Sequence, residues 1–377
     1  MDEHAFVLER QHFRHLLAAL QERGYQTIGP TVREGAIVYD VIESDTDLPV
    51  GWGDIQDEGS YQLMQRAEAA LFGYTLSPQS WKRFLHPPDV RLWQAHRTDG
   101  TFSITPAADE IPRCAFIGVR ACELHAIAIL DRVFLDGAFV DPIYQRRRAH
   151  TFIVAVNCGQ ASGTCFCASM QTGPAVDSGF DLALTEVIDA ERHYFVVNVG
   201  TEGGAEVLNA LPHREASAEE IAAAAQIVAA TAEQMGRSLE TANLKATLYN
   251  RSEDPLWDEV AERCLTCGNC TLVCPTCFCT TVTDVTDLSG AVAERRRQWD
   301  SCFTMEFSYI HGGSVRYTPK ARYRQWMTHK LASWIDQFGV SGCVGCGRCI
   351  TWCPVGIDIT DMARRLQTAD QPLGEAR

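Results

Sequence analysis

The chain has 377 residues, of which 46% are hydrophobic and 21% charged, proportions that suggest two or three ordinary globular domains. Its formal net charge of −15 argues against a nucleic acid as partner. The acidic N-terminus lacks the apolar segment of a secretory signal, and the longest apolar stretch is too short to span a membrane. Sixteen cysteines in such a chain favour metal ligation in a reducing cytoplasm over disulfides.

The first half of the chain (1–215) has the pattern of an α/β domain. Apolar periodicity predicts an amphipathic helix over 7–23, and two short strands follow over 25–30 and 36–42. The segment 49–111 has no regular period, so we expect a packed loop region with short helices there.

A βαβ unit follows this segment. A buried strand over 113–119, a helix over 122–135 and a second strand over 151–156 follow one another closely, and a further strand is expected over 193–199. Strands that alternate with helices in this way indicate a parallel sheet.

Cysteines follow both strands of this unit. Cys122 comes directly after the first strand, and Cys158, Cys165 and Cys167 follow the second. Because the carboxyl ends of neighbouring parallel strands face one crevice, these four thiols are expected to converge there. Four thiols in one crevice suit a third [4Fe–4S] cluster. Packing of small core residues is the other interpretation, and the dispersed spacing leaves both open. Cys114 lies inside the strand and is expected to pack in the core.

Residues 216–255 are predicted to form a helical bridge. The sequence of 217–220 resembles a capping box, and an alanine-rich helical pattern follows it. The bridge leads into the last part of the chain, 256–377, which we expect to be a helical, ferredoxin-like dicluster domain with a long insertion.

That last part contains one cysteine pattern twice, C-x2-C-x2-C-x3-C-P. This is the spacing with which bacterial ferredoxins bind [4Fe–4S] clusters, and in two-cluster ferredoxins the fourth cysteine of each run ligates the other cluster. Two structural zinc sites are the alternative, but zinc ligands usually come as separated C-x2-C pairs. We therefore assign two clusters, the first held by Cys264, Cys267, Cys270 and Cys353 and the second by Cys343, Cys346, Cys349 and Cys274.

The two runs are separated by 68 residues, 275–342, in which a helix is expected over 317–338. This insertion holds Cys277, Cys279 and Cys302. Since the two runs already supply eight thiolates, we expect these three to pack beside a cluster, with replacement of one ligand as the alternative.

Five segments carry a resemblance to a known family. They are G-V-R-A-C-E at 118–123, G-T-C-F-C at 163–167, C-P-T-C-F-C at 274–279, W-D-S-C-F at 299–303 and the second cysteine run at 342–354. Together they resemble the iron–sulfur β subunit of soluble, NADP-linked (sulfhydrogenase-type) [NiFe] hydrogenases. A related iron–sulfur subunit of anaerobic sulfite reductases is similar. The family has proline where this chain has Ala121.

The resemblance implies a non-catalytic electron-transfer subunit. On one side its partners would be the small and large subunits of a [NiFe] hydrogenase. On the other side its partner would be a flavin- and NAD(P)-binding diaphorase subunit. The same relay in an anaerobic sulfite reductase is one alternative. A cluster-based redox sensor is another, against which the length of the chain and the lack of a DNA-reading motif count. No residues are arranged in the sequence for substrate chemistry.

Overall fold

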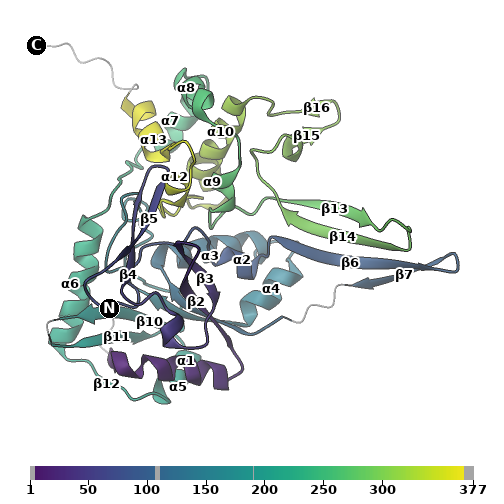
Figure 1. The fold of residues 1–377 in the computed structure, drawn as a ribbon. Coiled ribbons are helices and arrows are strands. Elements are labelled where there is room, and N and C mark those ends of the chain that lie inside the picture. Colours follow the sequence, from purple (N-terminus) through teal and green to yellow (C-terminus); the bar gives the residue numbers. More distant parts are fainter. Residues whose placement is uncertain (1–4, 107–110, 190, 369–377) are drawn as a thin grey trace, which may run out of the picture.

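In the computed structural model, which describes residues 5–106, 111–189 and 191–368, an eight-stranded mixed sheet forms the base of the molecule (Figure 1). The four central strands, β2, β8, β9 and β10, run parallel to one another, and the outer pairs are antiparallel. In spatial order the strands are β12 (Arg214–Glu215), β1 (Phe6–Glu9), β11 (His193–Val199), β10 (Leu182–Ile188), β9 (Thr151–Val156), β8 (Cys114–Val119), β2 (Gln26–Arg33) and β3 (Ala36–Val41).

Helices cover both faces of this sheet. Ile117 and Val154 face a core that includes α1 (Phe13–Glu22) and α5 (Glu202–Asn209), whereas Phe116 and Ile153 face α3 (Ala121–Phe134) and α4 (Pro142–Ala149). Alternate residues of one strand thus enter two different cores, which explains why the central strands are continuously apolar. The predicted βαβ unit, β8–α3–β9 with β8 parallel to β9, is confirmed.

The prediction of a helix over 7–23 is wrong at its start. Residues Phe6–Glu9 form β1, which pairs with β11 and β12, and a 3-10 turn, η1 (Arg10–His12), precedes α1. Val7 and Leu8 are both buried, on opposite faces of the sheet. A strand buries two adjacent apolar residues in this way, and a helix with one apolar face does not.

The prediction of an irregular region over 49–111 is wrong for 52–65 and 89–106, while residues 107–110 lie outside the described part of the chain. Two hairpins form here, and the second joins a hairpin of the insertion in a four-stranded sheet of order β13-β14-β6-β7 that projects as an arm (Figure 1). In β7 only Phe102 and Ile104 alternate with polar residues, too short a pattern to mark a strand, and the whole strand is exposed. The elements are η2 (Asp45–Asp47), β4 (Trp52–Asp57), β5 (Ser60–Gln65), α2 (Lys82–Leu85), β6 (Asp89–Thr98), β7 (Thr101–Pro106), β13 (Thr280–Thr286) and β14 (Val292–Trp299).

The cysteine runs lie in a second, mainly helical region above the sheet (Figure 1). Ser217 caps the bridging helix α6 with the expected capping box. The core of this region centres on Trp257, Trp326 and Met327. No helix within the described ranges is long and apolar enough to cross a membrane. The remaining elements are α6 (Ala218–Glu233), α7 (Leu244–Asn250), α8 (Leu256–Arg263), α9 (Asn269–Leu272), η3 (Glu306–Ser308), β15 (Tyr309–Ile310), β16 (Gly313–Ser314), α10 (Pro319–Thr328), the π-helix η4 (His329–Ser333), α11 (Trp334–Phe338), α12 (Arg348–Thr351) and α13 (Ile359–Thr368).

A buried ion pair joins the two regions. Glu123, in the first turn of α3, pairs with Arg348 of α12, and their side chains are 1% and 0% exposed. Tyr39 Oη and Trp81 Nε1 donate to the same carboxylate at 3.1 and 3.0 Å, and Arg348 Nε donates to the Ser77 carbonyl at 2.8 Å. Because the groups of this network come from segments far apart in the sequence, the pair fixes how the helical region sits on the sheet.

Removing one partner of this pair should destabilise the protein strongly. We expect Arg348→Met to lower the free energy of unfolding by about 3–5 kcal/mol, because the buried Glu123 carboxylate loses the guanidinium with which it pairs. Adding Glu123→Gln should recover part of that loss. The measurement is denaturant unfolding of the purified full chain.

The matched control is Arg324→Met, which breaks a surface pair with Glu253 whose side chains are 28% and 79% exposed. This variant should lose less than about 1 kcal/mol. Equal losses in the two arginine variants would show that the buried pair does not join the regions.

Candidate metal centres

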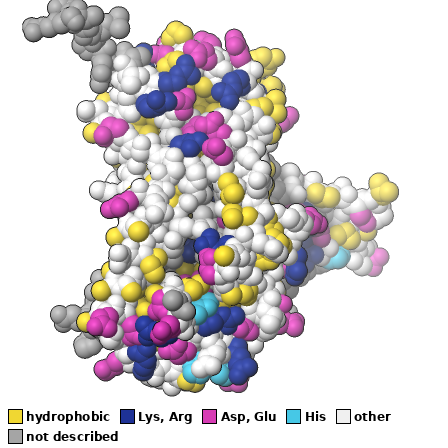
Figure 2. All heavy atoms as spheres, turned by 60° about the vertical axis from the view of Figure 1, so that its left-hand side comes forward, with side chains coloured by type: hydrophobic (Ala, Val, Ile, Leu, Met, Phe, Trp, Pro, Cys, Tyr) yellow, Lys and Arg dark blue, Asp and Glu magenta, His cyan; other side chains and the backbone are white. Residues whose placement is uncertain are grey.

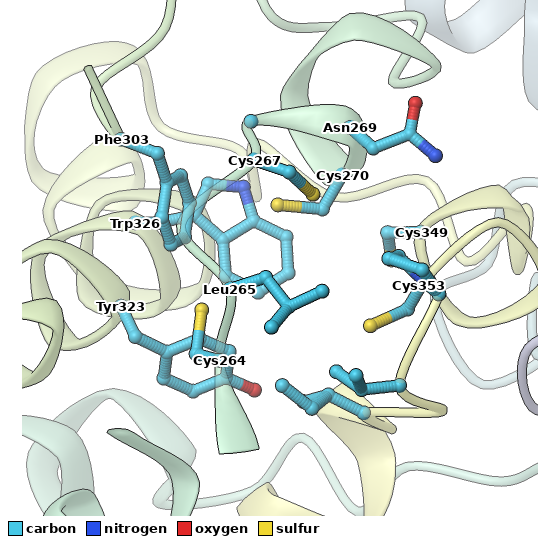
Figure 3. Close-up of a pocket in the computed structure, with 14 residues that line it drawn as sticks. Cys264, Leu265, Cys267, Asn269, Cys270, Phe303, Tyr323, Trp326, Cys349 and Cys353 are labelled. Atoms are coloured by element: carbon cyan, nitrogen blue, oxygen red, sulfur yellow. The ribbon is translucent and has the colours of Figure 1, made fainter. Parts of the chain in front are cut away.

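The thiols of the predicted first set face one another. Cys264 follows α8, Cys270 lies in α9 and Cys353 follows α12. Figure 3 shows the sulfur atoms of these three residues and of Cys267 directed toward a common space. Gly268, at φ +74°, makes the left-handed turn that brings Cys267 and Cys270 to the same side. An aromatic wall of Phe303, Tyr323 and Trp326 closes the space opposite Cys353 (Figure 3).

The thiols of the second set are also brought together. Burial, together with the neighbouring thiols of Cys346 and Cys274, raises the pKa of Cys343 to about 12. Burial likewise raises the pKa of Cys349, to which Cys343, Cys346, Cys274 and Cys270 all contribute. Cys274 of the first run therefore lies among the thiols of the second run, as the exchange of fourth cysteines predicts.

The four dispersed cysteines converge at the carboxyl ends of β8 and β9. Burial raises the pKa of Cys122, and the nearby thiols of Cys167 and Cys346 raise it further. Burial also raises the pKa of Cys165 to about 11, with contributions from Cys158 and Cys346. The crevice predicted from the strand order thus gathers all four thiols, and Cys346 of the second set is next to them.

The donors at all three places are thiols, which are the ligands that iron–sulfur clusters take. Metal binding requires deprotonated thiols, so filling these sites releases protons. Within the described ranges no group of three or more His, Cys, Asp or Glu side chains is arranged to hold a single metal ion.

Comparison with known proteins agrees with this donor set. A family model described as a 4Fe-4S dicluster domain matches residues 263–357. The chain is 31% identical over 312 residues to sulfhydrogenase 2 subunit beta of Pyrococcus furiosus, an alignment that covers 81% of this chain and 89% of that protein. The chain belongs to the hydrogenase-type iron–sulfur β subunits. No solved structure matches it. The predicted family is confirmed, as are a mixed α/β N-terminal region and a C-terminal 4Fe-4S dicluster domain.

In this β subunit the loop that carries Cys165 and Cys167 packs directly on the second cysteine run. Phe166 N donates to the Gly345 carbonyl at 2.8 Å. A Cβ on Gly345 would lie 2.7 Å from the backbone of Cys167, and one on Gly347 would overlap the Thr164 carbonyl oxygen. The two loops can therefore approach only because these positions are glycine.

Sequence reasoning missed two buried lysines beside the cysteines of the β subunit. Lys330 Nζ donates to Cys274 Sγ at 3.1 Å, and Lys82 Nζ donates to the Cys277 carbonyl at 2.9 Å and lies 3.9 Å from the centre of the Trp299 ring. Burial lowers the pKa of Lys82 to about 8. Both lysines lie far in sequence from their partners, so no local pattern marked them.

The contact between the two loops can be tested at Gly347. We expect Gly347→Ala to cost about 1–2 kcal/mol for its left-handed backbone, and about 1–3 kcal/mol more for the overlap with Thr164. Gly339→Ala is the matched control, since Gly339 has a similar φ of +73° and nothing within 4 Å of its Cβ position. Thermal unfolding of both variants measures the difference in stability. An equal loss of stability in the two variants would mean that the Cys165–Cys167 loop and the second cysteine run can separate without cost.

Proposed function

We propose that this β subunit relays electrons between a [NiFe] hydrogenase module and an NAD(P)H-linked flavoprotein subunit through three [4Fe–4S] clusters. The observation that carries the proposal is that each set of thiols lies next to another set, so that the three sets follow one another through the molecule. Cys122 and Cys167 neighbour Cys346 of the second set, and Cys349 of the second set neighbours Cys270 of the first. When bound, [4Fe–4S] clusters supply one-electron carriers whose potentials respond to their surroundings.

Each set supplies four thiols to one proposed cluster. Ferredoxin spacing supports the first two sets, and convergence in the strand crevice supports the third. The proposed ligands are Cys264, Cys267, Cys270 and Cys353 for the first cluster, Cys343, Cys346, Cys349 and Cys274 for the second, and Cys122, Cys158, Cys165 and Cys167 for the third.

The surroundings of the three sets differ. Cys267 of the first set is exposed, whereas Cys346, Cys122, Cys165 and Cys167 are buried. An exposed ligand brings a cluster close to the surface, where a partner's own carrier can approach. We therefore place one end of the relay at the first set, while the second set occupies the middle.

Exposed apolar residues on the arm support assembly with another subunit. Phe102 and Ile104 of β7 are exposed, as are Val282, Val285 and Leu288 in and beside β13. Figure 2 shows hydrophobic side chains on the projecting arm, among acidic and basic ones. Exposed apolar clusters of this kind mark protein–protein contacts.

The third cluster is tested by iron and acid-labile sulfide per chain, on full-length protein purified without oxygen. Cys165→Ala should lose about four of each relative to the unmodified protein, because one cluster loses a ligand. Cys114→Ala is the matched control, since Cys114 is a buried cysteine in β8 outside the three sets and should retain all iron. Unchanged iron in Cys165→Ala would remove the third cluster from the proposal.

The partners are tested by isolating the native complex through a tag on this chain. We expect a flavoprotein and the two [NiFe] hydrogenase subunits to co-purify, identified by mass spectrometry, and the complex to reduce NADP⁺ with hydrogen. A co-purifying siroheme protein without nickel would instead place the relay in a sulfite reductase. Recovery of the chain alone in every redox state would contradict a relay subunit.

A further inference from the structure

Three cysteines outside the proposed ligand sets meet at one place. Cys277 and Cys279 follow the first cysteine run, and Cys302 lies more than twenty residues further along the chain. The hairpin of β13 and β14 brings them together, because Thr280 pairs with Trp299 and Asp300 N donates to the Cys279 carbonyl at 2.9 Å. Cys302 follows the end of β14 at the base of this hairpin. It lies so close to Cys279 that the Cys279 thiol raises the pKa of the Cys302 thiol.

All three cysteines line the same cavity. It measures about 230 Å³, against about 30 Å³ for the space between the thiols of the first set. A cavity of this size holds a group of several atoms, since one water needs only about 10–15 Å³ measured in the same way. Aromatic side chains form much of the remaining wall, and they are Phe278, Phe307, Trp326 and Trp334.

Cations lie around this cavity. Lys330 and the half-buried Arg316 line it, and Lys82 donates to the backbone of Cys277. Lys82 and Lys330 are 3% and 4% exposed, and neither pairs with a carboxylate in the described part of the chain. Buried ammonium groups require nearby negative charge. Cys274 of the second set supplies that charge to Lys330, and cluster-bearing thiolates at Cys277 and Cys279 would supply it to Lys82.

A metal-ligating side chain of a second kind faces the cavity. His329 lines it and begins η4, a π-helical turn (His329–Ser333), a local distortion that is frequent at functional sites. Its ring lies against Trp334, with 5.1 Å between ring centroids. The imidazole is therefore held in one position on the wall that also carries Lys330.

We propose that Cys277, Cys279 and Cys302 hold a further iron–sulfur cluster, with His329 as its fourth ligand. Assembly from two ferrous ions, two ferric ions and four sulfide ions forms three iron–thiolate bonds and one iron–imidazole bond, and the three thiol protons leave to solvent. Three cysteines and one histidine also suit zinc, so zinc is the alternative that the metal content has to exclude. The site lies beside Cys274 of the second set and Cys270 of the first, so it adds a carrier next to the proposed relay and does not depend on the third cluster.

The test is iron, zinc and sulfide per chain in Cys302→Ser, on full-length protein purified without oxygen. We expect a loss of about four iron and four sulfide relative to the unmodified protein, and no loss in Cys114→Ser. Unchanged iron in Cys302→Ser, or one zinc per chain that disappears with this substitution, would overturn the proposal.

A second measurement covers the case in which Cys302→Ser does not fold. The unmodified protein should contain about sixteen iron atoms, and Cys165→Ala about twelve. About twelve iron atoms in the unmodified protein and about eight in Cys165→Ala would overturn the proposal of this site, while leaving the three-cluster relay intact. In His329→Gln we expect a shifted electron paramagnetic resonance signal from one cluster, and identical spectra would exclude His329 as a ligand.

Discussion

The buried pair of Glu123 and Arg348 is the interaction on which the arrangement of the cysteines depends. Glu123 is the residue after Cys122, and Arg348 is the residue before Cys349. A buried charge without its partner is costly, so the two cysteine-bearing segments are stable only when they are together. The pair therefore sets the distance between the strand crevice and the second cysteine run. Because Gly345 and Gly347 have no side chain, the loop of Cys165 and Cys167 then comes into backbone contact with the second cysteine run.

Charge is distributed unevenly in this acidic chain. Although the formal net charge is −15, the groups buried next to the cysteines include Lys82, Lys330, Arg120 and Arg348. Cations near a cluster stabilise the extra negative charge of its reduced state, and the protein adjusts cluster potentials through such surroundings. The positive residues inside the molecule thus have a chemical role that the overall charge does not reveal.

The sequence-based predictions succeeded where a local pattern was sufficient. The βαβ unit follows from apolar runs, and the placing of Cys122 beside Cys167 and of Cys158 beside Cys165 agrees with the rule that parallel strands share one edge for their carboxyl ends. Predictions failed where pairing was non-local or unmarked. β1 was taken for helix because it has only four residues and adjoins α1, and the arm was missed because its strands pair with segments far away in the sequence.

By itself the sequence determined the family, the dicluster domain and the two ferredoxin-type runs, because the spacing of cysteines within each run is a local property of the sequence. Only the tertiary structure decided which distant residues meet these cysteines. Lys330 reaches Cys274, and the β13–β14 hairpin returns Cys302 to Cys279. Packing and strand pairing bring the partners in such contacts together. Because the energies of these interactions depend on the whole fold, they produce no periodic pattern in the sequence.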